Sequence, residues 1–181
     1  MITVHFYTRQ KFTYPVQKFK KLVKSICKRF GVNNAIINIV ITDNRQIRSL
    51  NKKFHHRNAV TDCLSFNLSE EPRFPHFSIE RKFKKISAWS PRPSATSAVK
   101  KSFDIIVNAQ KAGAEAKKRG HSPQAELALY ITHGLLHNLG FDDLIAKKAK
   151  VMHCLEDEIL QQHGFGRVFE KSVTYNEKDT D

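Results

Sequence analysis

The chain has 181 residues, 40% of them hydrophobic and 27% charged, which fits one folded domain and excludes a disordered chain. No apolar run approaches the roughly 20 residues of a membrane helix, and the first residues lack the layout of a secretory signal, so we expect a cytoplasmic protein with no membrane partner. The formal net charge of +14 favours a polyanionic partner, most commonly nucleic acid, although a generally basic surface would give the same number.

Residues 2–7 predict a strand, because apolar and polar side chains alternate and β-branched and aromatic types are frequent. A helix follows over residues 15–30, with Pro15 in its first turn and Gly31 just past its end. The polar face of this helix carries a row of lysines that includes Lys18, Lys21 and Lys24. This row is either a solvated surface or a contact for the backbone of RNA.

Three more strands and one more helix are expected before residue 108. Residues 35–42 form a short, nearly continuous apolar strand, and Asp43 then caps a helix that runs to about Phe54. Residues 60–68 and 103–107 have the composition of a third and a fourth strand.

The connection between these last two strands is unusually long. Residues 69–101 contain four of the six prolines and the single Trp, and they show no sustained hydrophobic period. Basic side chains dominate, with eight Lys or Arg and two acids between residues 71 and 101. We interpret this segment as a basic loop or insertion within a single domain that spans residues 1–165.

The last third of the chain predicts three helices. The first covers residues 108–119 and ends at Gly120. Ser122 and Pro123 supply an N-cap and a first-turn proline for the second helix, which runs to about Asn138. The third spans about residues 146–162 and ends at Gly164, and residues 166–181 form a polar tail that we expect to fray.

Basic charge is concentrated in the first third of the chain. Residues 1–57 contain 13 Lys or Arg and a single acid, Asp43, whereas residues 102–181 are slightly acidic. Clustered positive charge attracts and steers polyanions at long range. The basic residues 1–57 are separate in sequence from the histidines of the last third of the chain.

A candidate metal site stands at residues 133–143, which read H-G-L-L-H-N-L-G-F-D-D. His133 and His137 are spaced i, i+4, so both imidazoles project from one face of a helix and can reach one ion. Gly140 allows a left-handed turn after the helix, which would bring Asp143 back towards the same ion. Three protein ligands leave one position open, which is typical of catalytic zinc and not of structural zinc.

Other interpretations of these residues exist. A histidine pair at this spacing can simply be two ordinary polar residues, and Asp142 or Asp143 can serve as the N-cap of the last helix. The three cysteines, at positions 27, 63 and 154, form no C-x-x-C pair and indicate neither a disulfide framework nor a thiolate zinc site. A zinc peptidase would carry Glu after the first histidine, and Gly134 stands there, which disfavours peptide hydrolysis.

The motif resembles the signature of the YbeY family of bacterial endoribonucleases, H-G-x-L-H-L-x-G-Y-D-H. A second stretch, L-N-K-K-F-H-H-R-N-A-V-T-D-C-L-S-F over residues 50–66, is similar to the family's L-N-x-x-Y-R-x-x-D-x-x-T-D-V-L-S-F. The resemblance implies an α+β fold, with a small mixed sheet of about four strands packed with about five helices. It also implies cleavage of single-stranded RNA, maturation of 16S rRNA and work on the small ribosomal subunit.

Carried over by position, His133 and His137 match the first two metal ligands of the family, and four departures follow. Asp143 stands where the family has a third histidine, and its oxygen is a harder, anionic ligand. The family's arginine is His55 here, with Arg57 two residues later. The family's aspartate is Asn58, and the insertion at 69–101 lengthens a connection that is normally short.

We therefore expect a zinc-dependent endoribonuclease with one ion per chain, held by His133, His137 and Asp143. Arg57 is the candidate clamp for the phosphate, because its planar fork can bind two oxygens, and His55 could serve when protonated. The altered third ligand and the displaced arginine motivate an alternative, a non-catalytic RNA-binding factor of ribosome assembly.

Overall fold

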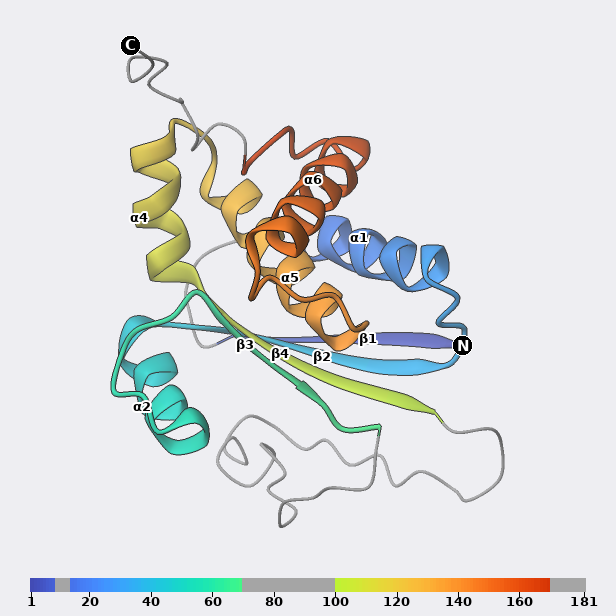
Figure 1. Ribbon diagram of the computed structural model, residues 1–181. Coiled ribbons are helices and arrows are strands. Elements are labelled where there is room, and N and C mark those ends of the chain that lie inside the picture. Colours follow the sequence, from blue (N-terminus) through green and yellow to red (C-terminus); the bar gives the residue numbers. More distant parts are fainter. Residues whose placement is uncertain (9–13, 70–99, 170–181) are drawn as a thin grey trace.

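The computed structural model describes residues 1–8, 14–69 and 100–169 (Figure 1). The larger part of the expected insertion, 70–99, and of the expected tail, 170–181, lies outside the described residues. In chain order the elements are β1 (Ile2–Thr8), α1 (Val16–Arg29), β2 (Ala35–Thr42), α2 (Asn44–His55), β3 (Cys63–Asn67), β4 (Lys101–Asn108), α4 (Ala109–Arg119), α5 (Pro123–Asn138) and α6 (Ala146–Gln162).

The four strands form one mixed sheet in the order β1-β2-β4-β3. β1, β2 and β4 are parallel, and β3 pairs antiparallel with β4 at the edge, with Cys63 opposite Val107. β2 and β4 are the central strands, and their runs of isoleucine and valine are buried on both faces, as expected for strands covered on two sides.

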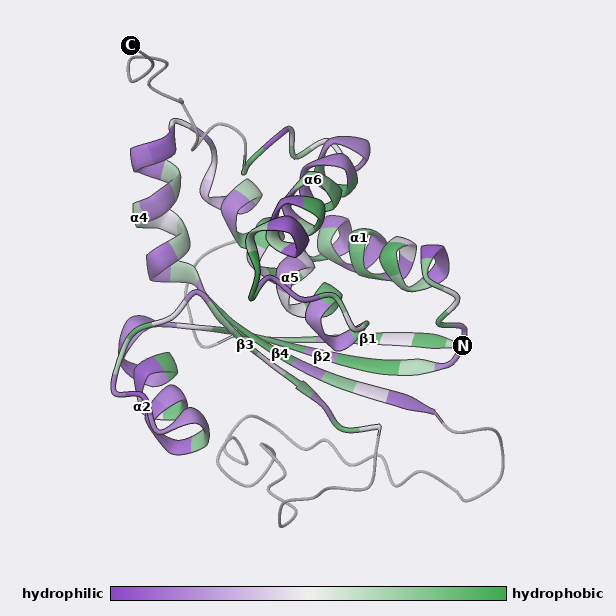
Figure 2. Cartoon of the chain, in the orientation of Figure 1, coloured by the Kyte–Doolittle hydropathy of each residue, from purple (hydrophilic) through white to green (hydrophobic). Residues whose placement is uncertain are grey.

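The two faces of the sheet carry different helices (Figure 1). One face packs with α1, α5 and α6 in the larger apolar cluster, which includes Ile37, Ile39 and Ile105. The other face packs with α2 in a smaller cluster, in which Ile47 of α2 meets Ile106 of β4. Figure 2 shows the strands as the most apolar part of the chain and α2 as a largely hydrophilic helix.

Helix α5 lies at the centre of the larger layer, and eleven of its sixteen residues are buried. A helix that is apolar on most sides is stable only when neighbours cover it on most sides, and here the sheet, α1, α4 and α6 do so. Its start is fixed locally, because the Ser122 side chain accepts a hydrogen bond from the Ala125 backbone N–H and Pro123 occupies the first turn.

The structure confirms the expected α+β class, with five helices and a four-stranded mixed sheet among the described residues. Strand ends differ from expectation. β3 begins at Cys63 instead of residue 60, because the Asp62 carboxylate accepts a hydrogen bond from the Cys63 backbone N–H. This hydrogen bond turns the chain before strand pairing begins. β4 begins at Lys101, two residues earlier than expected. Within the described ranges, no helix has the length and apolar character needed to cross a bilayer.

Candidate metal centre

Three side chains converge at the carboxyl end of α5. His133 and His137 lie one turn apart, with their Nε2 atoms separated by 3.0 Å. Asp143 lies in the loop that follows, with Oδ2 3.8 Å from Nε2 of His133 and Oδ1 3.8 Å from Nε2 of His137. The three side chains are 21%, 30% and 33% exposed, so the cluster opens to solvent.

The opposite nitrogen of each ring is engaged by a group that can only accept. Nδ1 of His133 lies 2.8 Å from Oε1 of Glu156, and Nδ1 of His137 lies 3.1 Å from the backbone oxygen of Phe141. A carboxylate and a carbonyl both require a proton on the nitrogen that faces them. Each neutral ring therefore presents the lone pair of Nε2 to the cluster, which is the tautomer that binds a metal.

This donor set fits a zinc-like ion. Two lone pairs that face each other across 3.0 Å repel, and a cation between them removes the repulsion. In a tetrahedral site with bonds of about 2.0–2.1 Å, ligand nitrogens lie about 3.3–3.4 Å apart. The carboxylate oxygens at 3.8 Å are a few tenths of an ångström wider, so a small inward movement of Asp143 completes the set.

Glu156 of α6 is the residue of this site that sequence reasoning missed. Its side chain is 1% exposed and bridges two histidines, with Oε1 on His133 and Oε2 2.9 Å from Nδ1 of His153. The His153 ring in turn stacks on Phe169, with centroids 3.6 Å apart. His153 thus helps to hold the carboxylate that orients His133.

The electrostatics of the centre favour a positive charge on it. Burial alone would lower the pKa of His133, but Glu156, Asp62 and Asp143 together hold that pKa above its usual value. Burial also opposes ionisation of Asp62, yet Lys111 and hydrogen bonds from Cys63 N–H and Thr61 keep the pKa of its carboxyl below the usual value. Asp62 belonged to the stretch that resembles the YbeY family, but no local pattern around it indicated a role beside His133.

The loop after α5 returns as expected. Gly140 has φ +95°, a conformation in which side chains are strained, and Phe141 N–H donates back to the Leu136 carbonyl. Asp142 does not cap the last helix. Its carboxylate accepts from Leu144 N–H and pairs with Lys148, while α6 starts after Ile145 with no side-chain cap, so the N-cap alternative is wrong for this residue.

Gly134 sits where α5 comes closest to the sheet. A Cβ there would lie 3.0 Å from Cγ2 of Ile105, 3.5 Å from Cβ of Ser65 and 3.7 Å from Sγ of Cys63. A side chain at the position that a zinc peptidase fills with Glu would therefore force Ile105 or the helix to shift in this fold. Its glycine lets the helix seat against β3 and β4, which fixes the height of His133 above the sheet.

The remaining predicted site residues lie apart from this cluster. His55 ends α2 on the other face of the sheet and stacks on Phe66, with centroids 6.1 Å apart. Arg57 is exposed just after it, and among the described residues no hydrogen bond or ion pair joins either side chain to the three converging groups. Lys21 and Lys24 are exposed on α1, whereas Lys18 donates to the Gly164 carbonyl and lies 4.0 Å from the Phe165 ring centroid.

The chain is similar to known proteins in sequence and in fold. A sequence model of the family described as "Endoribonuclease YbeY" matches residues 5–164. A protein of that name from Bacillus licheniformis is 30% identical over 151 residues, which cover 83% of this chain and 86% of the relative. Another from Caldicellulosiruptor bescii is 33% identical over 148 residues, covering 82% and 85%. A solution structure of a Thermotoga maritima protein shares the fold, with a TM-score of 0.55 at 18% identity over 98% of this chain and 99% of the other.

Proposed function

This chain belongs to the endoribonuclease YbeY family, and we propose that it is a metal-dependent endoribonuclease that cleaves single-stranded RNA. The proposed biological role is maturation of 16S rRNA during assembly of the small ribosomal subunit, in the cytoplasm. The name of the relatives supports RNA cleavage, and the three converging side chains support a metal ion.

The convergence of His133, His137 and Asp143 carries the proposal. Two imidazoles with their protons fixed on the outer nitrogens and one carboxylate form a three-ligand set that is open to solvent. Catalytic zinc sites have this composition, because an open position must remain for water or substrate. A bound zinc ion would supply Lewis-acid chemistry to a phosphodiester oxygen.

The chain's own residues prepare that chemistry. Glu156 holds the proton of His133 on Nδ1, and the Phe141 carbonyl does the same for His137, so both rings are oriented before any ion arrives. Since Glu156 is buried, its charge is screened little and raises the basicity of the ring that it contacts. Gly134 keeps α5 against the sheet and so fixes the position of the pair.

Substrate binding is assigned to basic side chains on both faces of the sheet. Lys18, Lys21 and Lys24 line α1, which lies on the same face of the sheet as α5, and they are proposed to contact the RNA backbone (Figure 1). Arg57 is the proposed clamp for a phosphate, because its exposed guanidinium can donate to two oxygens at once. His55 is proposed to contact phosphate on the same strand of RNA when its imidazole is protonated.

The test combines metal content with RNA cleavage. Wild-type protein is expected to bind one zinc per chain and to cut a single-stranded RNA in a manner that a chelator abolishes. His137→Ala should lose both properties, whereas Asp142→Asn, next to the proposed third ligand, should keep both. Asp143→His restores the ligand that the family signature carries and should bind zinc at least as tightly as the wild type.

Two results would overturn the proposal. Undiminished cleavage by His137→Ala would remove the metal centre from the reaction. Tight RNA binding with no cleavage under any divalent metal would instead support the non-catalytic assembly factor.

A further inference from the structure

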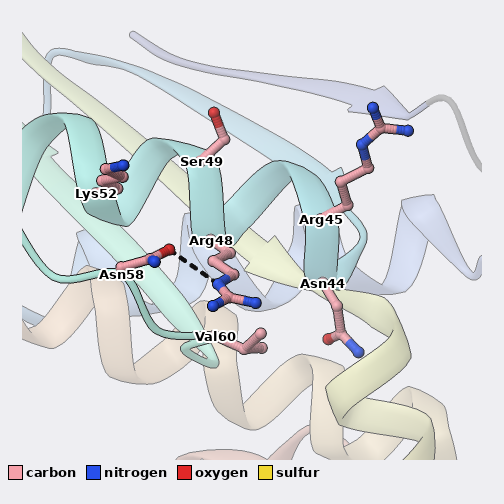
Figure 3. A pocket seen from close by; sticks show the side chains of 7 residues that line it. All are labelled: Asn44, Arg45, Arg48, Ser49, Lys52, Asn58 and Val60. Atoms are coloured by element: carbon pink, nitrogen blue, oxygen red, sulfur yellow. Dashed lines mark hydrogen bonds between the residues drawn. The ribbon is translucent and has the colours of Figure 1, made fainter.

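A second candidate site lies on α2, on the face of the sheet opposite to the metal centre (Figure 1). Here the surface is hollowed over a volume of about 500 Å³, open to solvent. The lining comes from one side of α2 and from the segment that leads into β3, namely Asn44, Arg45, Arg48, Ser49, Lys52, Asn58 and Val60 (Figure 3). None of these residues takes part in the metal centre.

The hollow is strongly basic. Arg45, Arg48 and Lys52 follow one another at i, i+3 and i+7, which places them along one side of the helix. Among the residues that the structure describes, no carboxylate forms an ion pair with any of the three. The acid nearest in sequence, Asp43, is occupied in capping α2 through the backbone N–H of Gln46. Like charges at this spacing repel, so an anion bound between them is favoured.

Arg48 is already positioned for such an anion. Its Nε donates to Oδ1 of Asn58 at 2.9 Å, which holds the guanidinium against the loop and leaves both terminal nitrogens as donors (Figure 3). Asn44 lies on the neighbouring turn, and its Oδ1 accepts from Asn108, which leaves its side-chain NH₂ as a donor. A guanidinium that is held in place, with further N–H donors beside it, can bind phosphate oxygens in pairs.

Residues 58–63 lead from the hollow towards the metal centre at the β3 edge of the sheet. Asn58 and Val60 line the hollow, and Cys63, three residues after Val60, lies beside Gly134, the neighbour of His133. Three extended residues span at most about 10 Å. A single strand of RNA held at both places would pass over this edge, and a short RNA would reach one place alone.

We propose that the α2 hollow binds backbone phosphates of the RNA substrate, at nucleotides beyond the one that is cut. This inference rests on the proposed function for the identity of the anion, and it extends that function to a site on the far face of the sheet. The ligand class is a phosphodiester chain, since a guanidinium fork held in place binds phosphate oxygens and six of the seven lining residues are polar or cationic.

The experiment compares two double substitutions that remove the same charge from the full-length protein. Arg45→Gln with Lys52→Gln empties the hollow of two cations while leaving the Arg48–Asn58 bond in place. Lys117→Gln with Lys118→Gln removes two exposed cations from α4 as the control. Binding of a labelled long oligouridylate is measured in chelator, so that cleavage does not interfere, over a range of salt.

Loss of two phosphate contacts should lower the slope of log affinity against log salt by about 1.4, since each contact to a single strand contributes about 0.7. The advantage of wild type over the α2 variant should then shrink about sevenfold between about 50 and 200 mM salt. The control should match the wild type. Arg48→Lys, which keeps charge but loses the fork, should bind more weakly at an unchanged slope.

Cleavage separates this inference from the proposed function. With metal present, the α2 variant should show a raised KM on the long RNA, an unchanged kcat, and normal kinetics on a dinucleotide-length substrate. Equal binding by the α2 and α4 variants would refute the hollow as a phosphate site, even if cleavage is normal. Tighter binding of oligoglutamate than of oligouridylate of matched charge by the wild type, with that preference lost in the α2 variant, would instead assign the hollow to an acidic protein and refute it too. If no metal restores cleavage but binding depends on α2, the hollow stands and the nuclease proposal fails.

Discussion

Replacement of Gly134 by Ala tests whether the contact between α5 and the sheet sets the position of the metal centre. The new Cβ would lie 3.0 Å from Cγ2 of Ile105, a fully buried residue of β4. A β-branched side chain in a packed strand has one favoured rotamer and cannot swing aside. The helix must therefore move or the strand must yield.

The cost can be worked out against a matched glycine. Gly113, inside α4, has nothing within 4 Å of the position that a Cβ would occupy, so Gly113→Ala should stabilise the protein by about 1 kcal/mol through helix propensity alone. Gly134→Ala gains the same amount and loses about 1–3 kcal/mol to overpacking. The two variants should then differ by about 1–3 kcal/mol, or by about 2–12 °C in Tm for a chain of this size.

Thermal unfolding in chelator measures this difference without any contribution from bound metal. Zinc affinity measured on the same two proteins then shows whether a shift of α5 spreads to His133. Equal melting temperatures for Gly134→Ala and Gly113→Ala would refute the argument, because the short contact would then cost nothing. A lower melting temperature with unchanged zinc affinity would keep the packing argument and refute its link to the centre.

Two further predictions concern individual side chains. Glu156→Gln keeps the shape of the side chain and one acceptor but removes the charge behind His133, so zinc affinity should fall about 10–100-fold. The control Glu158→Gln, two residues along α6 and exposed, should leave zinc affinity unchanged. Equal zinc affinities of the two variants would show that Glu156 does not support His133 as a ligand. For the cysteines, burial raises the pKa of Cys27 to about 11 and that of Cys63 well above its usual value, while Cys154 is exposed. Maleimide labelling of the native protein at pH near 8, read by peptide mass, should therefore modify Cys154 first, and rapid labelling of Cys27 would contradict the buried position of α1.

Local signals in the sequence were sufficient for the elements. Asp43 and Ser122 cap helices that begin where their side chains predicted, and the apolar run at 35–42 became a central strand of the same bounds. The ends of β3 were harder to place, because Asp62 diverts the chain through a hydrogen bond to its own neighbour, and composition carries no sign of that bond.

The cluster of side chains that could hold a metal ion could be predicted only as far as its residues are close in sequence. His133 and His137 are one helical turn apart, and Gly140 provides the turn that brings Asp143 back, so spacing alone brought these three together. Glu156 lies 23 residues beyond His133 on another helix, and its contact depends on how α6 packs across α5. The hollow on α2 could not be predicted from the sequence for the same reason, since Asn58 contacts Arg48 only after the loop folds back.

The carboxylate at position 143 and the basic surface are connected through charge. A divalent ion held by three neutral imidazoles keeps a net charge of +2, whereas two imidazoles and a carboxylate leave +1, and attraction for a phosphate falls in proportion.

An RNA-cutting protein with the weaker centre needs more of its substrate affinity from elsewhere. Arg45, Arg48 and Lys52 of α2 and the exposed lysines of α1 lie on opposite faces of the sheet, so both faces contribute to a field that the chain's net charge of +14 makes attractive to polyanions. Affinity supplied by contacts to the RNA backbone depends steeply on salt, whereas affinity supplied by direct contact of a phosphate with a metal ion depends on salt much less. The salt dependence of KM therefore reports which of the two sources this protein uses.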